Sequence, residues 1–166
     1  MKILTFGEIM LRLKTPEHLR IVQANGFEAS YGGAESNVAV SLSTLGDDAA
    51  FLTKLPDNPV GNAAFNELRR YGVDTSRILR GGPRLGIYYF EKGNDIRPTS
   101  VLYDRAGSAL AKASATEFDW ESLLSGIDIF FFSGVTPAIS PSVEQAVSNA
   151  LNYCHTHGIT VICDLN

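Results

Sequence analysis

The chain of 166 residues is poor in cysteine, in positive charge and in long apolar segments, and each shortage excludes a class of protein. Two cysteines, Cys154 and Cys163, are too few for the disulfide framework of a small secreted domain. Both lie in apolar, periodic segments, so we expect buried free thiols. No apolar run is long enough to span a bilayer, and the first residues lack the apolar core of a signal peptide. These absences predict a cytoplasmic protein without a membrane anchor.

Positive charge is scarce because 14 Lys and Arg residues are outnumbered by 18 Asp and Glu residues, for a formal net charge of −4. An acidic chain is not attracted electrostatically to nucleic acid or to an anionic membrane surface, and we expect neither as a partner. Hydrophobic residues make up 45% of the chain and charged residues 19%, which is typical of a globular domain with a core of its own.

The most informative segment is a glycine pair followed directly by a helical pattern. Gly32 and Gly33 precede residues 35–45, in which apolar side chains recur at helical spacing, and Gly46 follows where a C-terminal cap belongs. Glycines let the backbone approach a ligand closely, and the first turn of a helix presents free N–H groups. The pattern indicates a site for a polar ligand, although a tight loop without a ligand has the same signature.

Strand-like and helical patterns alternate along most of the chain. Apolar runs of the type found in buried parallel strands are separated by amphipathic helices that begin at Asn-Pro or Ser-Pro pairs and end at glycine. This alternation predicts parallel βαβ units with right-handed crossovers. The expected strands are 3–6, 49–53, 127–132 and 159–163, and the expected helices are 35–45, 59–71 and 141–157.

Two segments, about 11–31 and 86–105, interrupt the α/β alternation. The second holds two β-type runs, 86–91 and 99–104, with a turn at 92–95 between them, and so predicts a hairpin. A hairpin is not stable alone, so we expect it to pair with short strands of the first segment. The resulting small sheet would project from the α/β core as a lid over a ligand crevice or as a contact between copies of the chain.

With these motifs in order, the chain resembles the N-terminal half of the ribokinase-like (PfkB) carbohydrate kinases, and within them the 2-keto-3-deoxygluconate kinases. The resemblance covers nearly the whole chain, and it implies an α/β, Rossmann-like three-layer sandwich with a small projecting β-sheet lid. It rests on Gly7-Glu8, Gly32-Gly33 with Asn37 and Gly46, segments 55–61 and 68–75, Gly86-Ile87-Tyr88, Tyr103-Asp104-Arg105, segment 133–138, and Asp164-Leu165-Asn166.

The resemblance also implies which residues bind substrate. The backbone of Gly32 and Gly33 and the amide of Asn37 would bind sugar hydroxyls, while Tyr88 and Tyr103 would stack on the sugar and offer their own hydroxyls. Structural roles remain open for these side chains, namely loop capping for Asn37 and ordinary lid packing for the two tyrosines.

Two arginines and an asparagine complete the implied substrate site. The guanidinium of Arg105 suits a carboxylate. Arg12 stands near the position where fructokinase-like relatives carry an aspartate, which favours an acidic substrate over a neutral ketose. Asn166 follows a predicted parallel strand, where open α/β sheets bind ligands. The alternatives are a solvated loop charge for Arg105, a surface role for Arg12 and a polar strand end for Asn166.

In the family, a second half holds a Gly-Ala-Gly-Asp motif with the catalytic base, and the ATP site. Neither that motif nor a Walker-type motif occurs in these 166 residues. We therefore expect no catalytic base, cofactor-binding residue or metal ligand in this chain, and we expect ATP and Mg²⁺ to serve the full-length enzyme.

The resemblance thus implies that the full-length enzyme transfers the γ-phosphoryl group of ATP to the terminal hydroxyl of 2-keto-3-deoxygluconate, a sugar acid. A kinase for a neutral ketose such as fructose is the alternative within the same class. A non-catalytic module that binds sugar acids is the alternative from another class, favoured if the native chain ends at Asn166. A homo-oligomer formed through the β lid is also expected.

Overall fold

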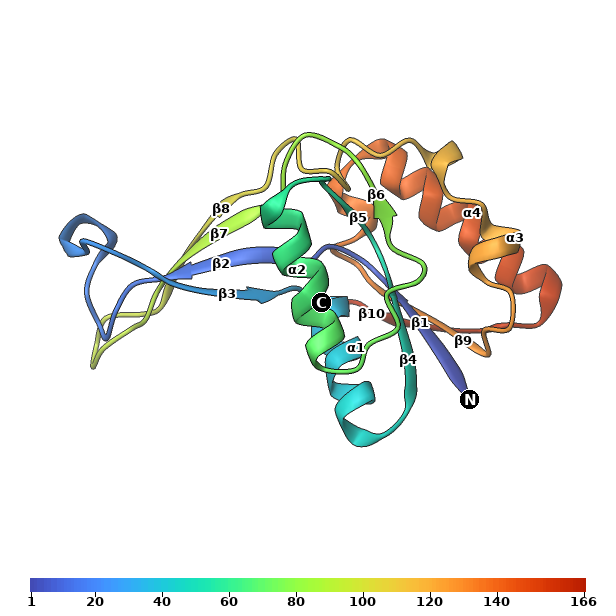
Figure 1. Cartoon of the computed structure of the whole chain (residues 1–166), viewed down its shortest axis with the longest axis horizontal. Helices are drawn as coiled ribbons and strands as arrows, with labels where there is room; N and C mark the ends of the chain where they lie inside the picture. The colour runs from blue at the N-terminus through green and yellow to red at the C-terminus, as the bar shows by residue number, and fades with distance from the viewer.

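Four parallel strands form the central sheet of the computed structural model, which describes residues 1–166 (Figure 1). They are β1 (Lys2–Phe6), β4 (Asp48–Leu52), β9 (Ile129–Ser133) and β10 (Thr160–Asp164). The order across the sheet is β10-β9-β1-β4, and every neighbouring pair is parallel. The predicted βαβ architecture is confirmed, with strand boundaries within two residues of those expected.

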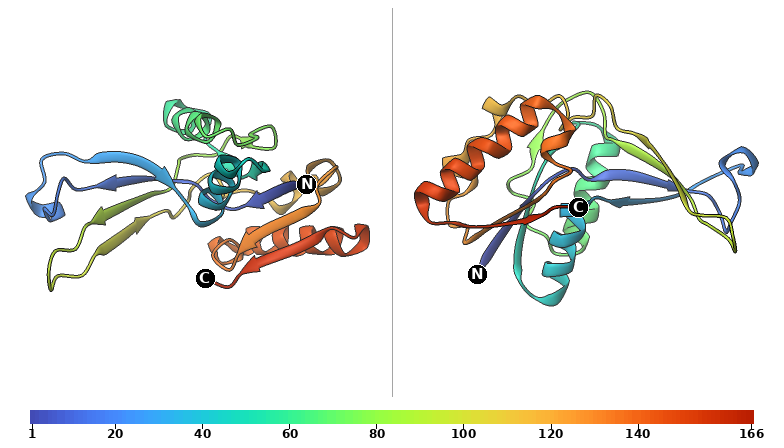
Figure 2. Two further views of the ribbon diagram at one scale, coloured as in Figure 1. Left: turned by 90° about the horizontal axis from the view of Figure 1, so that it is seen from below. Right: turned by 180° about the vertical axis from the view of Figure 1, so that it is seen from behind.

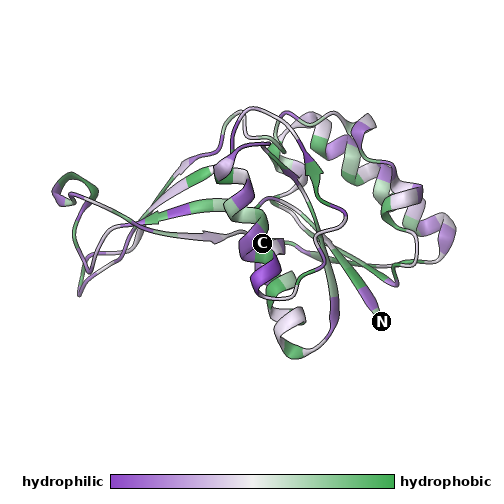
Figure 3. Cartoon of the chain, viewed as in Figure 1, coloured by the Kyte–Doolittle hydropathy of each residue, from purple (hydrophilic) through white to green (hydrophobic).

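Helices cover both faces of this sheet and complete three layers (Figure 2). The helices α1 (Ala34–Leu45) and α2 (Pro59–Arg70) lie on one face. The short α3 (Trp120–Leu123) and the long α4 (Pro141–His157) lie on the other. Apolar and polar residues alternate along α4, as expected of a helix with one buried side (Figure 3).

Several short elements lie between the main strands and helices. They are the 3₁₀ turns Ile21–Gln23, Ala115–Glu117 and Pro137–Ile139, and the small parallel pair of β5 (Lys54–Leu55) and β6 (Leu79–Arg80). None of the helices is both long and apolar enough to cross a bilayer.

Two apolar cores hold the layers together. Alternation along β1 sends Leu4 and Phe6 into the core that includes α3 and α4, where the Phe6 and Trp120 rings lie edge to face at 5.6 Å. Phe51 of β4 enters the second core, which includes Ala64 and Leu68 of α2. Because each core fixes one face of the sheet, the carboxyl ends of its strands are held in place for the site described below.

The helix ends follow the capping signals in the sequence. The Asn58 side chain accepts a hydrogen bond from the Gly61 N–H at 2.9 Å, and the Ser140 hydroxyl accepts one from the Val143 N–H at 3.3 Å. Gly46 and Gly158 end α1 and α4 in the left-handed region, with φ of 96° and 69°.

The two interrupting segments do pair into a small mixed sheet that projects from the core (Figure 1). Its strands are β2 (Met10–Lys14), β3 (Glu28–Gly32), β7 (Ile87–Glu91) and β8 (Ser100–Asp104), in the order β3-β2-β7-β8. The hairpins β2–β3 and β7–β8 are antiparallel, and a parallel pairing of β2 with β7 joins them. We call this sheet the lid.

One expected burial is wrong. The segment 159–163 does form β10, but the strand is exposed along its length, with Val161 40% and Ile162 45% exposed. The reason is its place in the sheet, because β10 is an edge strand that pairs only with β9. Cys163 is therefore exposed, whereas Cys154, on the buried side of α4, is inaccessible as expected.

This difference predicts the thiol chemistry of the chain. Burial raises the pKa of the Cys154 thiol to about 11, so little reactive thiolate forms there at neutral pH. In the folded 166-residue chain, a thiol reagent such as DTNB should label Cys163 rapidly and leave Cys154 unmodified. In denaturant both should react, and a Cys163→Ser variant should show no fast phase. Rapid labelling of both cysteines in the folded chain would contradict this placement of α4 and β10.

Candidate functional site

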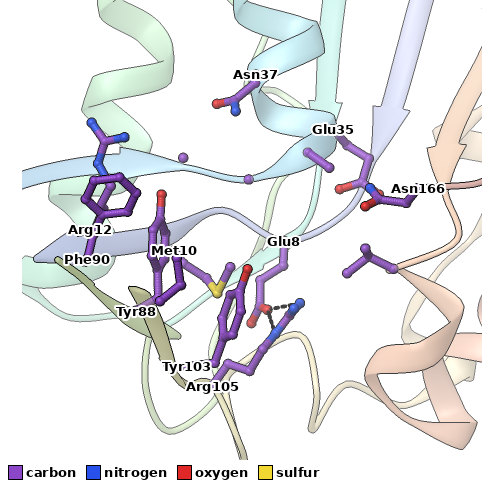
Figure 4. Close-up of a pocket in the computed structure, with 15 residues that line it drawn as sticks. Glu8, Met10, Arg12, Glu35, Asn37, Tyr88, Phe90, Tyr103, Arg105 and Asn166 are labelled. Carbon is purple, nitrogen blue, oxygen red and sulfur yellow. Dashed lines mark hydrogen bonds and ion pairs between the residues drawn. The ribbon is translucent and has the colours of Figure 1, made fainter. Parts of the chain in front are cut away.

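A pocket of about 260 Å³ lies where the lid meets the carboxyl ends of the central strands (Figure 4). Its walls come from the segments after β1 and β9, the β3–α1 junction, the lid strands and the end of the chain. All eight residues predicted from the sequence to bind substrate line this pocket, namely Arg12, Gly32, Gly33, Asn37, Tyr88, Tyr103, Arg105 and Asn166. The structure thus gathers residues from five helices and strands, together with three that lie beside them, into one site, and their binding of substrate remains a prediction.

The lid presents one face to the pocket through strand register. Arg12 on β2 lies opposite Tyr88 on β7, and Tyr88 lies opposite Tyr103 on β8. Alternation then places Phe90 and Val101 on the same face, and both line the pocket. The Tyr88 and Tyr103 ring centroids are 5.9 Å apart. The lid therefore offers a row of one guanidinium and two phenol groups.

The two glycines of the pair serve different purposes. A Cβ on Gly32 would point between the Asn37 Oδ1 and Tyr88 Oη atoms, 3.4 Å from each, so this glycine keeps the pocket open. A Cβ on Gly33 would lie 1.9 Å from the main-chain oxygen of Glu8. The sequence suggested that both glycines serve the approach of a ligand, but Gly33 is required by the close packing of two backbone segments.

Arg105 is not a free loop charge. Its Nε atom donates to Glu8 Oε2 at 2.8 Å, and its Nη2 atom lies 2.5 Å from the same oxygen. The Ser108 hydroxyl donates to Glu8 Oε1. The Arg105 guanidinium carbon also lies 5.9 Å from the Tyr103 ring centroid. The guanidinium thus enters the pocket with one edge already occupied by a buried carboxylate.

Arg12 is the cation of the pocket without an acidic partner. Its Nε atom donates to the Ser30 hydroxyl at 2.8 Å, and its guanidinium carbon lies 5.8 Å from the Phe90 ring centroid. No carboxylate lies within 4.0 Å of its guanidinium nitrogens, in contrast to Arg105. An anionic ligand would therefore find a more available charge at Arg12 than the sequence suggested.

The first turn of α1 supplies polar groups on the opposite side. Gly33 caps the helix without a side-chain acceptor, so first-turn N–H groups are left for a ligand. The Asn37 side chain is exposed, makes no hydrogen bond within the chain and extends toward the pocket (Figure 4).

Asn166 lines the pocket from the segment after β10. Its φ is 66°, and its N–H donates to Asp164 Oδ1 at 3.0 Å.

Two buried carboxylates at the pocket, Glu8 and Glu35, were missed as site residues. Glu35 Oε1 accepts hydrogen bonds from the Ser133 N–H at 3.0 Å, the Ser133 hydroxyl at 2.6 Å and the Thr136 hydroxyl at 2.7 Å. A Cβ on Gly7 would lie 2.1 Å from Glu35 Oε2, so that glycine makes room for the carboxylate. For Glu8 the available sequence signal was the Gly7-Glu8 pair after the first strand.

A second arginine–carboxylate pair stands outside the pocket, at the base of the lid. Arg84 donates from Nη1 and Nη2 to the two oxygens of Asp104 at 2.8 and 2.9 Å. These hydrogen bonds hold the pKa of Asp104 below its ordinary value and raise that of Arg84. The pair fixes the end of β8 beside Arg105.

The arrangement can bind a small polyhydroxylated anion. Guanidinium groups suit a carboxylate, while phenols, an amide and free backbone N–H groups suit hydroxyls. No group of three or more His, Cys, Asp or Glu residues is placed to hold a metal ion. Both oxygens of the Glu8 carboxylate and one oxygen of the Glu35 carboxylate already accept hydrogen bonds within the chain.

Comparison with known proteins gives a consistent family. Residues 1–166 match the pfkB family of carbohydrate kinases. The 2-dehydro-3-deoxygalactonokinase of Haloferax volcanii is 41% identical over 165 residues, which is 99% of this chain and 52% of that protein. The chain spans about half the length of the curated relatives it matches.

Solved structures of sugar kinases share the fold of this chain. The crystal structure of 2-dehydro-3-deoxygluconokinase from Thermotoga maritima is 51% identical, with a TM-score of 0.97 over all of this chain and 51% of its own. A sugar kinase from Pyrococcus horikoshii, solved in complex with ATP, is 25% identical, with a TM-score of 0.86 over 99% of this chain and 53% of its own. The fold is that of ribokinase-like proteins, as the sequence predicted.

The glycine pair provides a matched test of this geometry. Gly33→Ala must displace the backbone at Glu8, and we expect it to lower the free energy of unfolding by about 1–3 kcal/mol, as overpacking does. Gly32→Ala meets only contacts at 3.4 Å and should leave stability within about 1 kcal/mol. Urea denaturation of the two variants measures the difference. Equal stabilities would show that Gly33 does not pack against Glu8 as described.

Proposed function

The chain belongs to the pfkB family of carbohydrate kinases, and from this premise we propose that the protein containing it phosphorylates a 2-keto-3-deoxy sugar acid with ATP. The gluconate form and its galactonate epimer are the substrates named for the relatives at 51% and 41% identity. The proposed reaction transfers the γ-phosphoryl group of ATP to the terminal hydroxyl of the sugar acid.

The observation that carries the acid preference is the pairing of two guanidinium groups with two phenols in one small pocket. Arg12 and Arg105 line the same cavity as Tyr88 and Tyr103. A neutral ketose needs hydroxyl partners but no cation, whereas a sugar acid needs a positive group for its carboxylate. The phenols and the Asn37 amide are then available to the sugar hydroxyls.

The role proposed for this chain is binding and orientation. Phosphoryl transfer depends on holding the acceptor hydroxyl in line with the phosphoryl donor, and a rigid pocket at the strand ends supplies that position. The ATP-bound relative supports ATP as the donor. We further propose that Mg²⁺ accompanies ATP in the complete enzyme.

The experiment is a coupled ADP-release assay on the complete protein, with the two 2-keto-3-deoxy acids, fructose and ribose as acceptors. We expect kcat/KM to be at least about tenfold higher for one of the acids than for either neutral sugar. The 166-residue chain alone should release no ADP. Preference for fructose would establish the neutral-ketose alternative, and binding of the acid without turnover in the complete protein would establish a binding module.

Arg105 provides the sharpest variant. Loss of a charge-assisted hydrogen bond of about 1.5–3 kcal/mol should raise the KM for the sugar acid roughly 10- to 100-fold in Arg105→Ala. Arg105→Lys should recover part of the loss, because a point charge replaces a planar fork. The KM for ATP should stay nearly constant, and Arg70→Ala, on the exposed side of α2, is the control. An unchanged KM for the acid in Arg105→Ala would exclude this residue from carboxylate binding.

We also propose that the complete protein forms a homodimer through the lid. Strand β8 is an edge strand, and large apolar side chains are exposed on the lid at Val22, Ile96 and Leu102. Sedimentation equilibrium should show a dimer that dissociates in Leu102→Lys, while Leu45→Lys, at the exposed end of α1, should remain dimeric. A wild-type monomer at micromolar concentration would contradict the proposal.

A further inference from the structure

We propose that Glu8 is a positioning residue that sets the orientation of the Arg105 guanidinium and thereby decides which of its edges meets the ligand carboxylate. The identity of that ligand rests on the proposed function. Glu8 and Arg105 are 97 residues apart, and their contact joins the end of β1 to the segment after β8. The proposal gives Glu8 a role in specificity without contact with the substrate.

The contact occupies one particular edge of the guanidinium. Both the Nε and Nη2 atoms of Arg105 face a single oxygen, Glu8 Oε2. A guanidinium has five N–H donors in a fixed plane, so fixing the Nε–Nη2 edge also fixes the direction of the Nη1–Nη2 edge. That remaining edge is the one left to bind a carboxylate in the pocket that Arg105 lines.

The surroundings of Glu8 hold its carboxylate in one place. Its side chain is only 4% exposed, and the Ser108 hydroxyl donates to Oε1, the oxygen that Arg105 leaves free. A Cβ on Gly86 would lie 3.0 Å from Oε1, so this glycine gives the carboxylate its space. The main-chain oxygen of Glu8 is packed against Gly33. A carboxylate fixed on both oxygens and at its backbone is a rigid reference for Arg105.

The balance of charges in the pocket makes the orientation of the Arg105 guanidinium decisive for binding a carboxylate. The charged side chains that line the pocket are Glu8, Glu35, Arg12 and Arg105, two of each sign, so the pocket attracts an acid through geometry rather than through excess charge. A ligand carboxylate beside buried Glu8 would be repelled unless the Arg105 guanidinium stands between the two. By holding one edge of Arg105, Glu8 keeps the guanidinium in that intervening position.

The test is Glu8→Gln in the complete protein, because glutamine keeps the shape and one oxygen acceptor but removes the charge. Arg105 should lose its fixed edge, and the KM for the sugar acid should rise roughly tenfold, while kcat and the KM for ATP change less than about twofold. Glu28→Gln is the matched control, since Glu28 forms an exposed ion pair with Lys14 on the lid. A purely structural role for Glu8 would lower the folded fraction and leave KM unchanged.

A second readout does not depend on activity. The Arg105 Nε–H resonance, assigned by its loss in Arg105→Lys, should exchange slowly with solvent in the wild-type protein and faster in Glu8→Gln. If Glu8→Gln does not fold, Ser108→Ala takes its place as the test. It removes only the hydrogen bond from Ser108 to Glu8 and should raise the KM for the sugar acid about two- to threefold.

The outcomes separate the two proposals. If the complete protein phosphorylates no sugar acid, the proposed function fails, while Nε–H exchange still decides whether Glu8 holds Arg105. A wild-type Nε–H that exchanges freely overturns the positioning role. An unchanged KM for the acid in folded Glu8→Gln, or in Ser108→Ala where Glu8→Gln does not fold, also overturns it.

Discussion

The close approach of the Glu8 main chain to Gly33 is the constraint on which the site depends. At that point the chain leaving β1 for the lid passes so near the start of α1 that a single methyl group would lie 1.9 Å from the Glu8 oxygen. The contact fixes the first turn of α1 relative to the strand that leads into the lid. It also anchors the residue whose side chain holds Arg105, so packing of two backbone segments determines where a guanidinium lies.

Burying charge beside the pocket is costly, and the chain meets that cost with hydrogen bonds. Glu35 is 2% exposed, and its Oε1 accepts three hydrogen bonds from Ser133 and Thr136, which tie the N-terminus of α1 to the end of β9. The positive end of the helix dipole favours a carboxylate there as well. These hydrogen bonds stiffen the side of the pocket formed by the start of α1 and the end of β9, which suits a site that must hold a ligand in one orientation.

The sequence predicted the central sheet, helices and lid because their signals are local. Apolar periodicity marks α4, and a two-residue alternation puts Tyr88 and Phe90 on one lid face. The Glu8–Arg105 contact could not be found this way, because no local pattern relates residues 97 positions apart. The exposure of β10 could not be predicted either, since an apolar run looks the same in an edge strand and in a central strand. Burial of a strand depends on which elements pack against that strand.

The parallel pairing of β2 with β7 has a consequence for the order in which the molecule assembles. Residue 11 lies opposite residue 87, and α1, β4 and α2 all lie between them in the chain. Joining the two hairpins therefore closes a long loop between β2 and β7. The entropic cost of closing it is lowest once the intervening layers have folded and brought these two strands together. We therefore expect the β2–β7 pairing to form late in folding and, by the same energetics, to separate early in local unfolding. Such separation would part the two hairpins that line the pocket while the central sheet stays folded.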